Sequence, residues 1–290
     1  MKNLDLSTLP AKKRKQIVSY LRAGIQLLYF LFLPSVFTAA FNGVKYIFTQ
    51  LGQGEKIEMT AFVSALLLVC AFTIVFGRFF CGFACAFGSL GDAMHAIYGI
   101  ICKKRKKKPR RIKPETAKKL ALIKYGILFL IALTCFAGVY QKARGTSPWD
   151  VFSMLHAGNF RLSSYVPGIV LLLLILVGMF FEERFFCRFL CPMGAVFSLL
   201  PVLPFFTLHR KRENCIRGCS ACTRQCPSAV ELPSDGSMEI SGDCFQCQKC
   251  IDTCPKGNIR CGVKELHGNE ILFTLFRAVF LLTLLLWAGI

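Results

Sequence analysis

Long apolar stretches alternate with short polar or basic segments along the whole chain. Stretches of this length are typical of transmembrane helices, because about 20 apolar residues cross the hydrocarbon core of a bilayer. The pattern predicts five spans, at residues 23–48, 59–80, 120–140, 167–181 and 271–290. The first is too long for a cleaved signal peptide, so we expect it to be retained. The last contains Arg277, and a helix lying on the membrane surface is the alternative for it.

The basic residues are concentrated in a few segments, and their positions predict the topology. The chain carries 36 Lys and Arg against 16 Asp and Glu, a net charge of +20. Because Lys/Arg-rich segments stay on the cytosolic side of bacterial membranes, the basic loop 103–119 and the hydrophilic block 209–267 are expected inside, and loops 52–58 and 141–166 outside. We therefore predict a multi-pass protein of the bacterial cytoplasmic (inner) membrane, in contact with membrane lipids. No nucleic-acid partner is expected, since such a surface interleaves cations with aromatic platforms.

An 11-residue segment occurs twice, at 78–88 and 184–194, with identical residues at seven positions. Each copy lies at the cytosolic end of a predicted span and holds two cysteines four residues apart. These edge cysteines are Cys81, Cys85, Cys187 and Cys191. On an α-helix this spacing places both thiols of a pair on one face, and four thiols would converge if the two copies meet. Arg78 and Arg184 would then offset the negative charge of thiolates or of a cluster.

The edge cysteines have three interpretations. They could hold a third iron–sulfur cluster or another metal, they could exchange with a disulfide partner, or they could be small buried residues, as cysteine often is. The recurrence of both cysteines in matching frames favours a metal or redox site.

Two longer cysteine runs lie in the hydrophilic block. The second, Cys244-x2-Cys247-x2-Cys250-x3-Cys254-Pro255, has the spacing of bacterial ferredoxins. The first has one extra residue in its first gap and reads Cys215-x3-Cys219-x2-Cys222-x3-Cys226-Pro227. Zinc is the alternative metal, but four cysteines per run with a Cys-Pro ending match zinc ribbons poorly. We expect the block to fold only with its metals bound.

In two-cluster ferredoxins the last cysteine of each run binds the other cluster. By this crossed arrangement, one 4Fe-4S cluster would be held by Cys215, Cys219, Cys222 and Cys254. The other would be held by Cys244, Cys247, Cys250 and Cys226. Two such clusters would lie close enough to exchange electrons.

The remaining chemistry-bearing residues show no comparable pattern. The cysteines without one, which we interpret as packing residues, are Cys70, Cys102, Cys135 and Cys261. The four His residues fall outside the predicted spans, so a transmembrane haem is not expected. In the outer loop, Trp149 is predicted to anchor at the membrane interface. If this loop instead binds a quinone or a partner, Asp150 is the candidate for proton handling.

With these motifs the chain resembles the NosR/NapH family of membrane polyferredoxins over roughly residues 59–262. The resemblance is carried mainly by Cys187–Gly194 and by the run from Cys244 to Pro255. The chain departs from the family at Ala86, where a Pro is usual, and in the extra residue of the first run. It is similar to the short members without an extracytoplasmic flavin domain, so any flavin is expected on a partner. The resemblance implies electron passage between membrane or cytosol and an extracytoplasmic system, with quinol the donor in some branches.

We therefore predict an α-helical integral membrane protein with a duplicated two-helix unit and a cytosolic two-cluster ferredoxin-like module. The predicted divisions are a basic N-terminus (1–22), a first transmembrane unit (23–102), a basic loop (103–119), a second transmembrane unit (120–208), the ferredoxin-like domain (209–267) and a C-terminal helix (268–290). The predicted function is that of an electron-transfer subunit rather than a stand-alone enzyme. It would link a cytosolic donor or the quinone pool to an extracytoplasmic flavoprotein or reductase. The alternative is an accessory protein for the assembly or reductive activation of a metalloenzyme.

Overall fold

The computed structural model is mostly helical and describes residues 11–107, 109, 111–140, 145–161, 163–262 and 270–289. The longer helices are α1 (Ala11–Phe32), α2 (Val36–Gln53), α3 (Ala61–Phe76), α4 (Ala86–Lys104), α6 (Ile123–Phe136), α8 (Val166–Phe181) and α12 (Glu270–Trp287). The shorter ones are α5 (Pro114–Leu120), α7 (Pro148–His156), α9 (Pro192–Leu199), α10 (Ala221–Gln225) and α11 (Lys249–Thr253). Two π-helical turns are η2 (Phe80–Ala84) and η5 (Phe186–Leu190), and two 3-10 turns are η4 (Ser163–Tyr165) and η6 (Arg212–Asn214).

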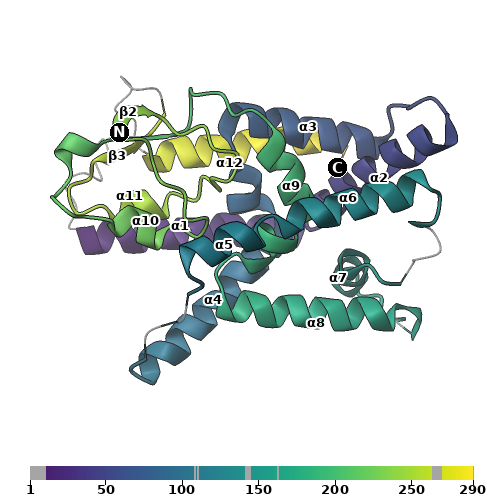
Figure 1. Cartoon of the computed structure of the whole chain (residues 1–290), viewed down its shortest axis with the longest axis horizontal. Coiled ribbons are helices and arrows are strands. Elements are labelled where there is room, and N and C mark those ends of the chain that lie inside the picture. Colours follow the sequence, from purple (N-terminus) through teal and green to yellow (C-terminus); the bar gives the residue numbers. More distant parts are fainter. Residues whose placement is uncertain are drawn as a thin grey trace.

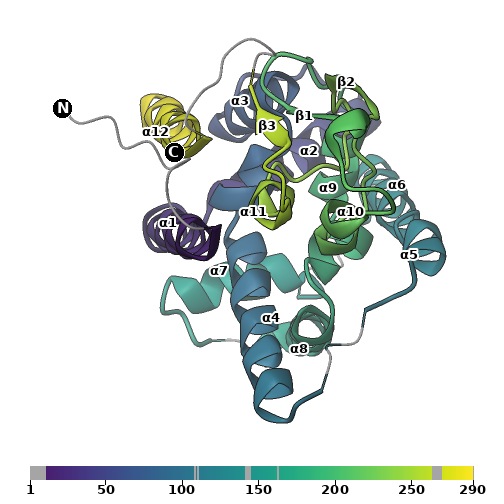
Figure 2. The same cartoon turned by 90° about the vertical axis from the view of Figure 1, so that its left-hand side faces the viewer.

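Three short strands form one antiparallel sheet in the order β2-β1-β3. They are β1 (Leu208–Lys211), β2 (Asp235–Met238) and β3 (Ile259–Cys261). Figure 1 shows the sheet, α10 and α11 at one end of the long axis, while α3, α6, α8 and α12 run along that axis. Figure 2 looks onto this end and shows α1, α8 and α12 nearly end on. The cysteine-rich block therefore caps one end of a helical bundle.

Two helical segments are long and apolar enough to cross a membrane, Glu115–Phe136 and Ser163–Phe181. The pair Gln16–Phe32 and Val36–Gln53 adds a third candidate if it counts as one span. Its halves meet at 61°, so the helix bends within the predicted first span, and that span stays a prediction. Pro34 lies in the connection, where it has no N–H to continue the helix. The segments of α3 and α12 are apolar but shorter. The described chain thus has two or three candidate spans, and five spans stay a prediction.

The outer face of α8 exposes a continuous set of large apolar side chains. Val170, Leu173, Leu174 and Val177 are 50–62% exposed. Apolar surface in contact with water costs about 25 cal/mol per Å², whereas contact with lipid tails removes that cost. Such a face fits a helix in a bilayer.

The segment predicted to anchor at the outer interface instead folds into the core as α7. Ser147 caps this helix by accepting a hydrogen bond from the backbone N–H of Asp150. Trp149 is only 8% exposed. The centroid of its ring lies 5.1 Å from that of Phe41 and 6.1 Å from that of Phe186. The expectation of an interfacial Trp149 is therefore wrong, because aromatic neighbours from α2 and η5 surround the indole.

Candidate functional site

The two repeats adopt the same local structure around their cysteines. In each copy the first cysteine lies in a π-helical turn, and the second lies just beyond it in extended backbone that begins the next helix. The backbone N–H of Cys85 donates to the Phe80 carbonyl at 2.8 Å. The N–H of Cys191 donates to the Phe186 carbonyl at 2.9 Å. These bonds span five residues, as in a π-helix. The shared α-helical face expected for each pair is therefore wrong, because the helix breaks between the two thiols.

The arginine that begins each repeat packs against the glycine that ends the other. A side-chain Cβ on Gly88 would meet Arg184 Nη1 at 2.5 Å. A Cβ on Gly194 would likewise meet Arg78 Nη2 at 3.0 Å. Both arginines are fully buried. The repeated glycine thus leaves space for a crossing guanidinium, and the two copies face each other as a pseudo-symmetric pair.

This crossing brings the four edge cysteines together. Each is only 3–5% exposed. They lie close enough for their charges to interact, Cys85 with Cys81 and Cys187, and Cys191 with all three. Arg78 Nη2 lies 4.0 Å from Cys81 Sγ, where it can compensate thiolate charge. The structure therefore gathers every predicted edge residue, and their role as metal ligands stays a prediction.

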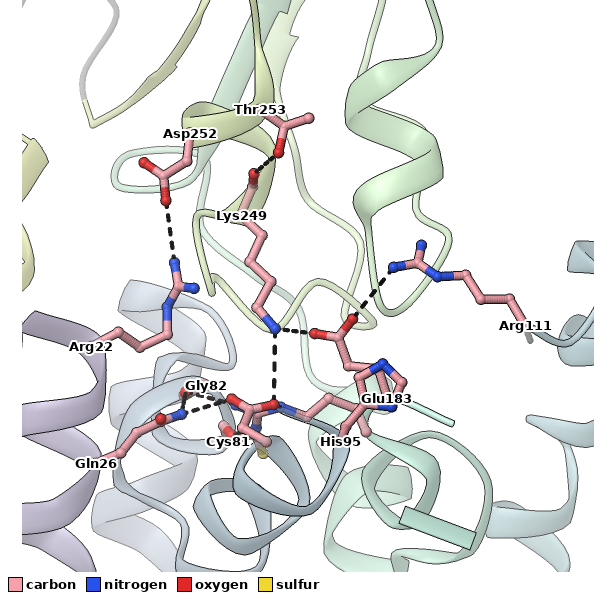
Figure 3. Close-up of polar contacts among 12 residues, drawn as sticks. Arg22, Gln26, Cys81, Gly82, His95, Arg111, Glu183, Lys249, Asp252 and Thr253 are labelled. Carbon is pink, nitrogen blue, oxygen red and sulfur yellow. Dashed lines mark hydrogen bonds and ion pairs between the residues drawn. The ribbon is translucent and has the colours of Figure 1, made fainter. Parts of the chain in front are cut away.

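A buried charged layer connects the repeats to the ferredoxin block. Asp92 on α4 accepts hydrogen bonds from Arg184 Nε at 2.9 Å and from Gln26 Nε2 at 2.8 Å. Lys249 on α11 pairs with Glu183 (Figure 3). Its Nζ also lies 4.0 Å from Asp92 Oδ1. Burial alone would raise the pKa of Asp92, but the Arg184 and Lys249 charges hold it below its usual range. Ion pairs thus fix the block to the end of the bundle.

The second cysteine run lies directly on the first repeat. The Cα of Gly82, next to Cys81, faces the backbone carbonyl of Phe245 with no room for a side chain between them. The Phe245 ring lies 4.7 Å from the guanidinium carbon of Arg78 and 5.6 Å from that of Arg184. Such cation–π contacts are stabilising when desolvated. One aromatic residue between two predicted cluster ligands is therefore held by both repeats.

Five thiols of the block line one pocket, together with apolar residues, Ser228, Gln248 and Lys249. They belong to Cys222, Cys226, Cys244, Cys247 and Cys250. The charges of the last four interact with one another. Burial raises the pKa of Cys226 to about 11 and that of Cys244 and Cys250 well above the usual value. A bound metal stabilises the thiolate form of the thiols that coordinate it. Crossed ligation predicts one cluster at Cys226, Cys244, Cys247 and Cys250, and Cys222, which lines the same pocket, is predicted to bind the other cluster.

Two members of the other predicted ligand set contact Asn258. Its side chain contacts Cys215 Sγ at 3.4 Å, and its backbone N–H donates to Cys254 Sγ at 3.3 Å. Arg210 on β1 donates to Cys222 Sγ at 3.1 Å. The fourth member, Cys219, lies half-buried in the same loop. Cysteines from both runs therefore meet here as well.

The chemistry of these thiols suits an iron–sulfur cluster, because a cubane takes one thiolate on each of its irons. Within the described residues, no three His, Cys, Asp or Glu side chains are close enough to hold one metal ion. The donor chemistry fits 4Fe-4S clusters, and the ligation itself stays a prediction.

A groove between α1 and α4 opens beside these sites. It holds about 1040 Å³ of space, open solvent included. Polar and charged residues, among them Arg22, Gln26, Asp92 and Lys249, line it together with small and apolar residues of the two helices. The groove is therefore amphipathic and borders the charged layer.

Several of these features have only weak signals in the sequence. Asp92 interrupts an otherwise uncharged helix stretch, which is a signal for a buried ion pair. The seven identities of the repeat include its glycine, which indicates a close approach. Nothing in the local sequence indicates that Phe245 would contact both arginines, because the contact joins segments more than 60 residues apart.

Comparison with known proteins supports an iron–sulfur assignment. A family model described as a 4Fe-4S binding domain matches residues 59–109 and 166–211. Each matched segment contains one copy of the repeat with its two edge cysteines. No solved structure matches the chain.

Three relatives illustrate the similarity. The uncharacterized protein MJ0750 of Methanocaldococcus jannaschii is 27% identical over 83% of this chain and 93% of its own length. The uncharacterized protein MJ0749 of the same organism is 30% identical over 70% of this chain and 71% of its own length. The ferredoxin-type protein NapH of Haemophilus influenzae is 24% identical over 72% of this chain and 70% of its own length.

Proposed function

Because the chain belongs to the NosR/NapH-type family of membrane polyferredoxins, we propose that it relays electrons through three successive cysteine sites. These are a first ferredoxin cluster (Cys215, Cys219, Cys222, Cys254), a second ferredoxin cluster (Cys226, Cys244, Cys247, Cys250) and a third cluster at the edge cysteines. The partners at the two ends are a cytosolic donor or the quinone pool and an extracytoplasmic flavoprotein or reductase. When bound, the clusters supply one-electron chemistry, and the protein supplies thiolates, buried cations and the exclusion of water.

The observation that carries this proposal is the contact between Gly82 and Phe245. Gly82 follows the edge ligand Cys81, and Phe245 lies between two ligands of the second ferredoxin cluster. Their backbones touch without an intervening side chain. Two redox sites joined in this way are neighbours, so an electron can pass between them without a mobile carrier.

The packing of α7 supports an exit on the side opposite the ferredoxin block. A relay from one membrane face must otherwise cross a hydrocarbon core of roughly 30 Å. Phe186 directly precedes Cys187, and Phe87 follows Cys85 by two residues. The centroids of these two rings lie 5.0 Å apart. Phe87 lies 4.5 Å from Phe152 of α7. Because α7 belongs to the loop predicted outside, this contact shortens the remaining path.

The groove between α1 and α4 is our proposed site for quinol as the electron donor. Its polar residues suit a hydroxylated ring, and its apolar residues suit an isoprenoid tail. A quinol oxidised there would release two protons to water and two electrons, one at a time, to the clusters. An Ala93→Trp variant should block quinol-driven reduction and leave dithionite-driven reduction unchanged. Equal loss of both would contradict this entry site.

The relay is tested with purified protein in vesicles. Dithionite is added on one side, and reduction of a membrane-impermeant acceptor is followed on the other. Anaerobic iron and sulfide counts precede the assay, with about eight irons expected for two clusters and about twelve for three. Transfer across the membrane supports the relay. Intact clusters without transfer would favour the accessory function in assembly or reductive activation of a metalloenzyme.

The edge cysteines are tested by Cys191→Ser, with Cys70→Ser as the matched control. The first variant should lose transfer and keep both ferredoxin EPR signals, because it removes one ligand of the edge site only. The control should keep transfer, since Cys70 lies outside the three sites. If Cys191→Ser transfers at the unchanged rate, the edge cysteines are packing residues.

A further inference from the structure

Arg277 lies in the middle of α12 and is completely buried, with 0% of its surface exposed. Its guanidinium carbon lies 4.6 Å from the ring centroid of Phe79 and 4.4 Å from that of Phe273. Among the described residues, no nitrogen or oxygen atom is a hydrogen-bond partner of its three nitrogens. Within the same residues, no carboxylate lies at ion-pair distance from it.

Three other deeply buried cations are paired with carboxylates. Arg184 pairs with Asp92 at 2.5 Å. Arg78 and Lys124 share Asp243, at 3.5 Å and 2.6 Å. An uncompensated buried charge costs several kcal/mol even after relaxation. Because Arg277 has no carboxylate partner among the described residues, we expect a different anion to face it.

Two thiols act on Arg277. The larger effect comes from Cys261 on β3, through its charge and a side-chain hydrogen bond, and the smaller effect comes from the charge of Cys244, a ligand of the proposed second ferredoxin cluster. Helix α12 is also held to the same loop by the Thr274 hydroxyl, which donates to Gln248 Oε1 at 2.9 Å. The guanidinium therefore points from α12 toward the thiols of the block.

We propose that Arg277 is the counter-cation of the cluster held by Cys226, Cys244, Cys247 and Cys250, and that it raises the reduction potential of that cluster. The inference rests on the proposed function, because it requires a cluster at these thiols. Four thiolates outweigh the positive charge of an iron–sulfur core, so the cluster is an anion. Reduction adds one electron from the donor and makes it more negative. A fixed cation in a low-dielectric site stabilises the reduced form more than the oxidised form.

Two buried arginines thus have separate roles. Arg210 hydrogen-bonds Cys222 Sγ and is only 4% exposed, so it acts on the first ferredoxin cluster. Arg277 acts on the second. Arg210 therefore provides a control that has the same chemistry and burial but faces a different cluster.

The test is an EPR-monitored redox titration of the purified whole chain with Arg277→Met, Arg277→Lys and Arg210→Met. Arg277→Met should shift the midpoint of one ferredoxin cluster to a more negative potential, because it removes the charge and keeps an apolar side chain. Arg277→Lys should keep most of the original value. Arg210→Met should shift the midpoint of the other cluster and leave the first unchanged.

Two results would overturn the proposal. One is an unchanged midpoint in Arg277→Met with both clusters present. The other is loss of one cluster's iron in both the Met and the Lys variants, which would mean that Arg277 acts through packing rather than charge. Iron lost in Met but kept in Lys supports the counter-cation role. Absence of four-thiolate clusters from the unmodified chain would instead contradict the proposed function itself, so the two failures are distinguishable.

Discussion

Replacing Gly82 by Ala tests the contact on which the relay depends. The new methyl group would lie closer than 3.0 Å to the carbonyl oxygen of Phe245, and real Cβ atoms essentially never approach that closely. The opposing atom belongs to the backbone, so no side-chain rotation relieves the clash. The cysteine loop must withdraw by on the order of 1 Å to restore ordinary contact, and overpacking of this kind costs about 1–3 kcal/mol.

The matched control is Gly99→Ala on α4. A Cβ added at Gly99 would have no heavy atom within 4 Å outside its own stretch of helix backbone. An alanine there should stabilise the helix by about 0.5–1 kcal/mol, since glycine loses more backbone entropy on folding. The two variants therefore make the same chemical change, and we expect opposite effects on the free energy of unfolding.

Both variants are compared by chemical unfolding in detergent and by the vesicle transfer assay. Gly82→Ala should lower the unfolding midpoint and slow transfer, because it separates the second ferredoxin cluster from the edge cysteines. Iron content should stay near that of the unmodified protein, since no ligand is removed. If Gly82→Ala matched Gly99→Ala in stability and in rate, the block would not be seated on the first repeat.

Three further predictions concern the rest of the molecule. Asp92→Asn should destabilise the protein by about 3–5 kcal/mol in chemical unfolding, because it leaves Arg184 buried without its carboxylate; an effect below about 1 kcal/mol would show the pair to be solvated. Trp149→Ala should cost about 3–5 kcal/mol, as for a core aromatic residue, and a negligible loss would return this side chain to the membrane interface. Removal of iron by a chelator should abolish amide-exchange protection in β1, β2 and β3 while α8 stays protected, and retained protection in the strands would mean that the block folds without metal.

The sequence alone determines the parts of this protein that depend on short-range spacing. The two ferredoxin runs predict which cysteines can share a cluster, because a tight loop can reach only nearby irons. Apolar segments predict helices in lipid, and the resemblance to a family predicts electron transfer. The duplicated 11-residue segment also predicts that four cysteines could meet, and the structure brings them together.

Only the tertiary structure decides how these parts are joined. The π-helical turns at Cys81 and Cys187, the return of α7 into the core and the burial of Arg277 each depend on contacts between distant segments. A local pattern reports which face of a helix is apolar, but not what lies against it. The contact of Gly82 with Phe245 sets the order of the proposed sites and joins residues far apart in the chain. It arises because the loop that carries Phe245 packs against both repeats.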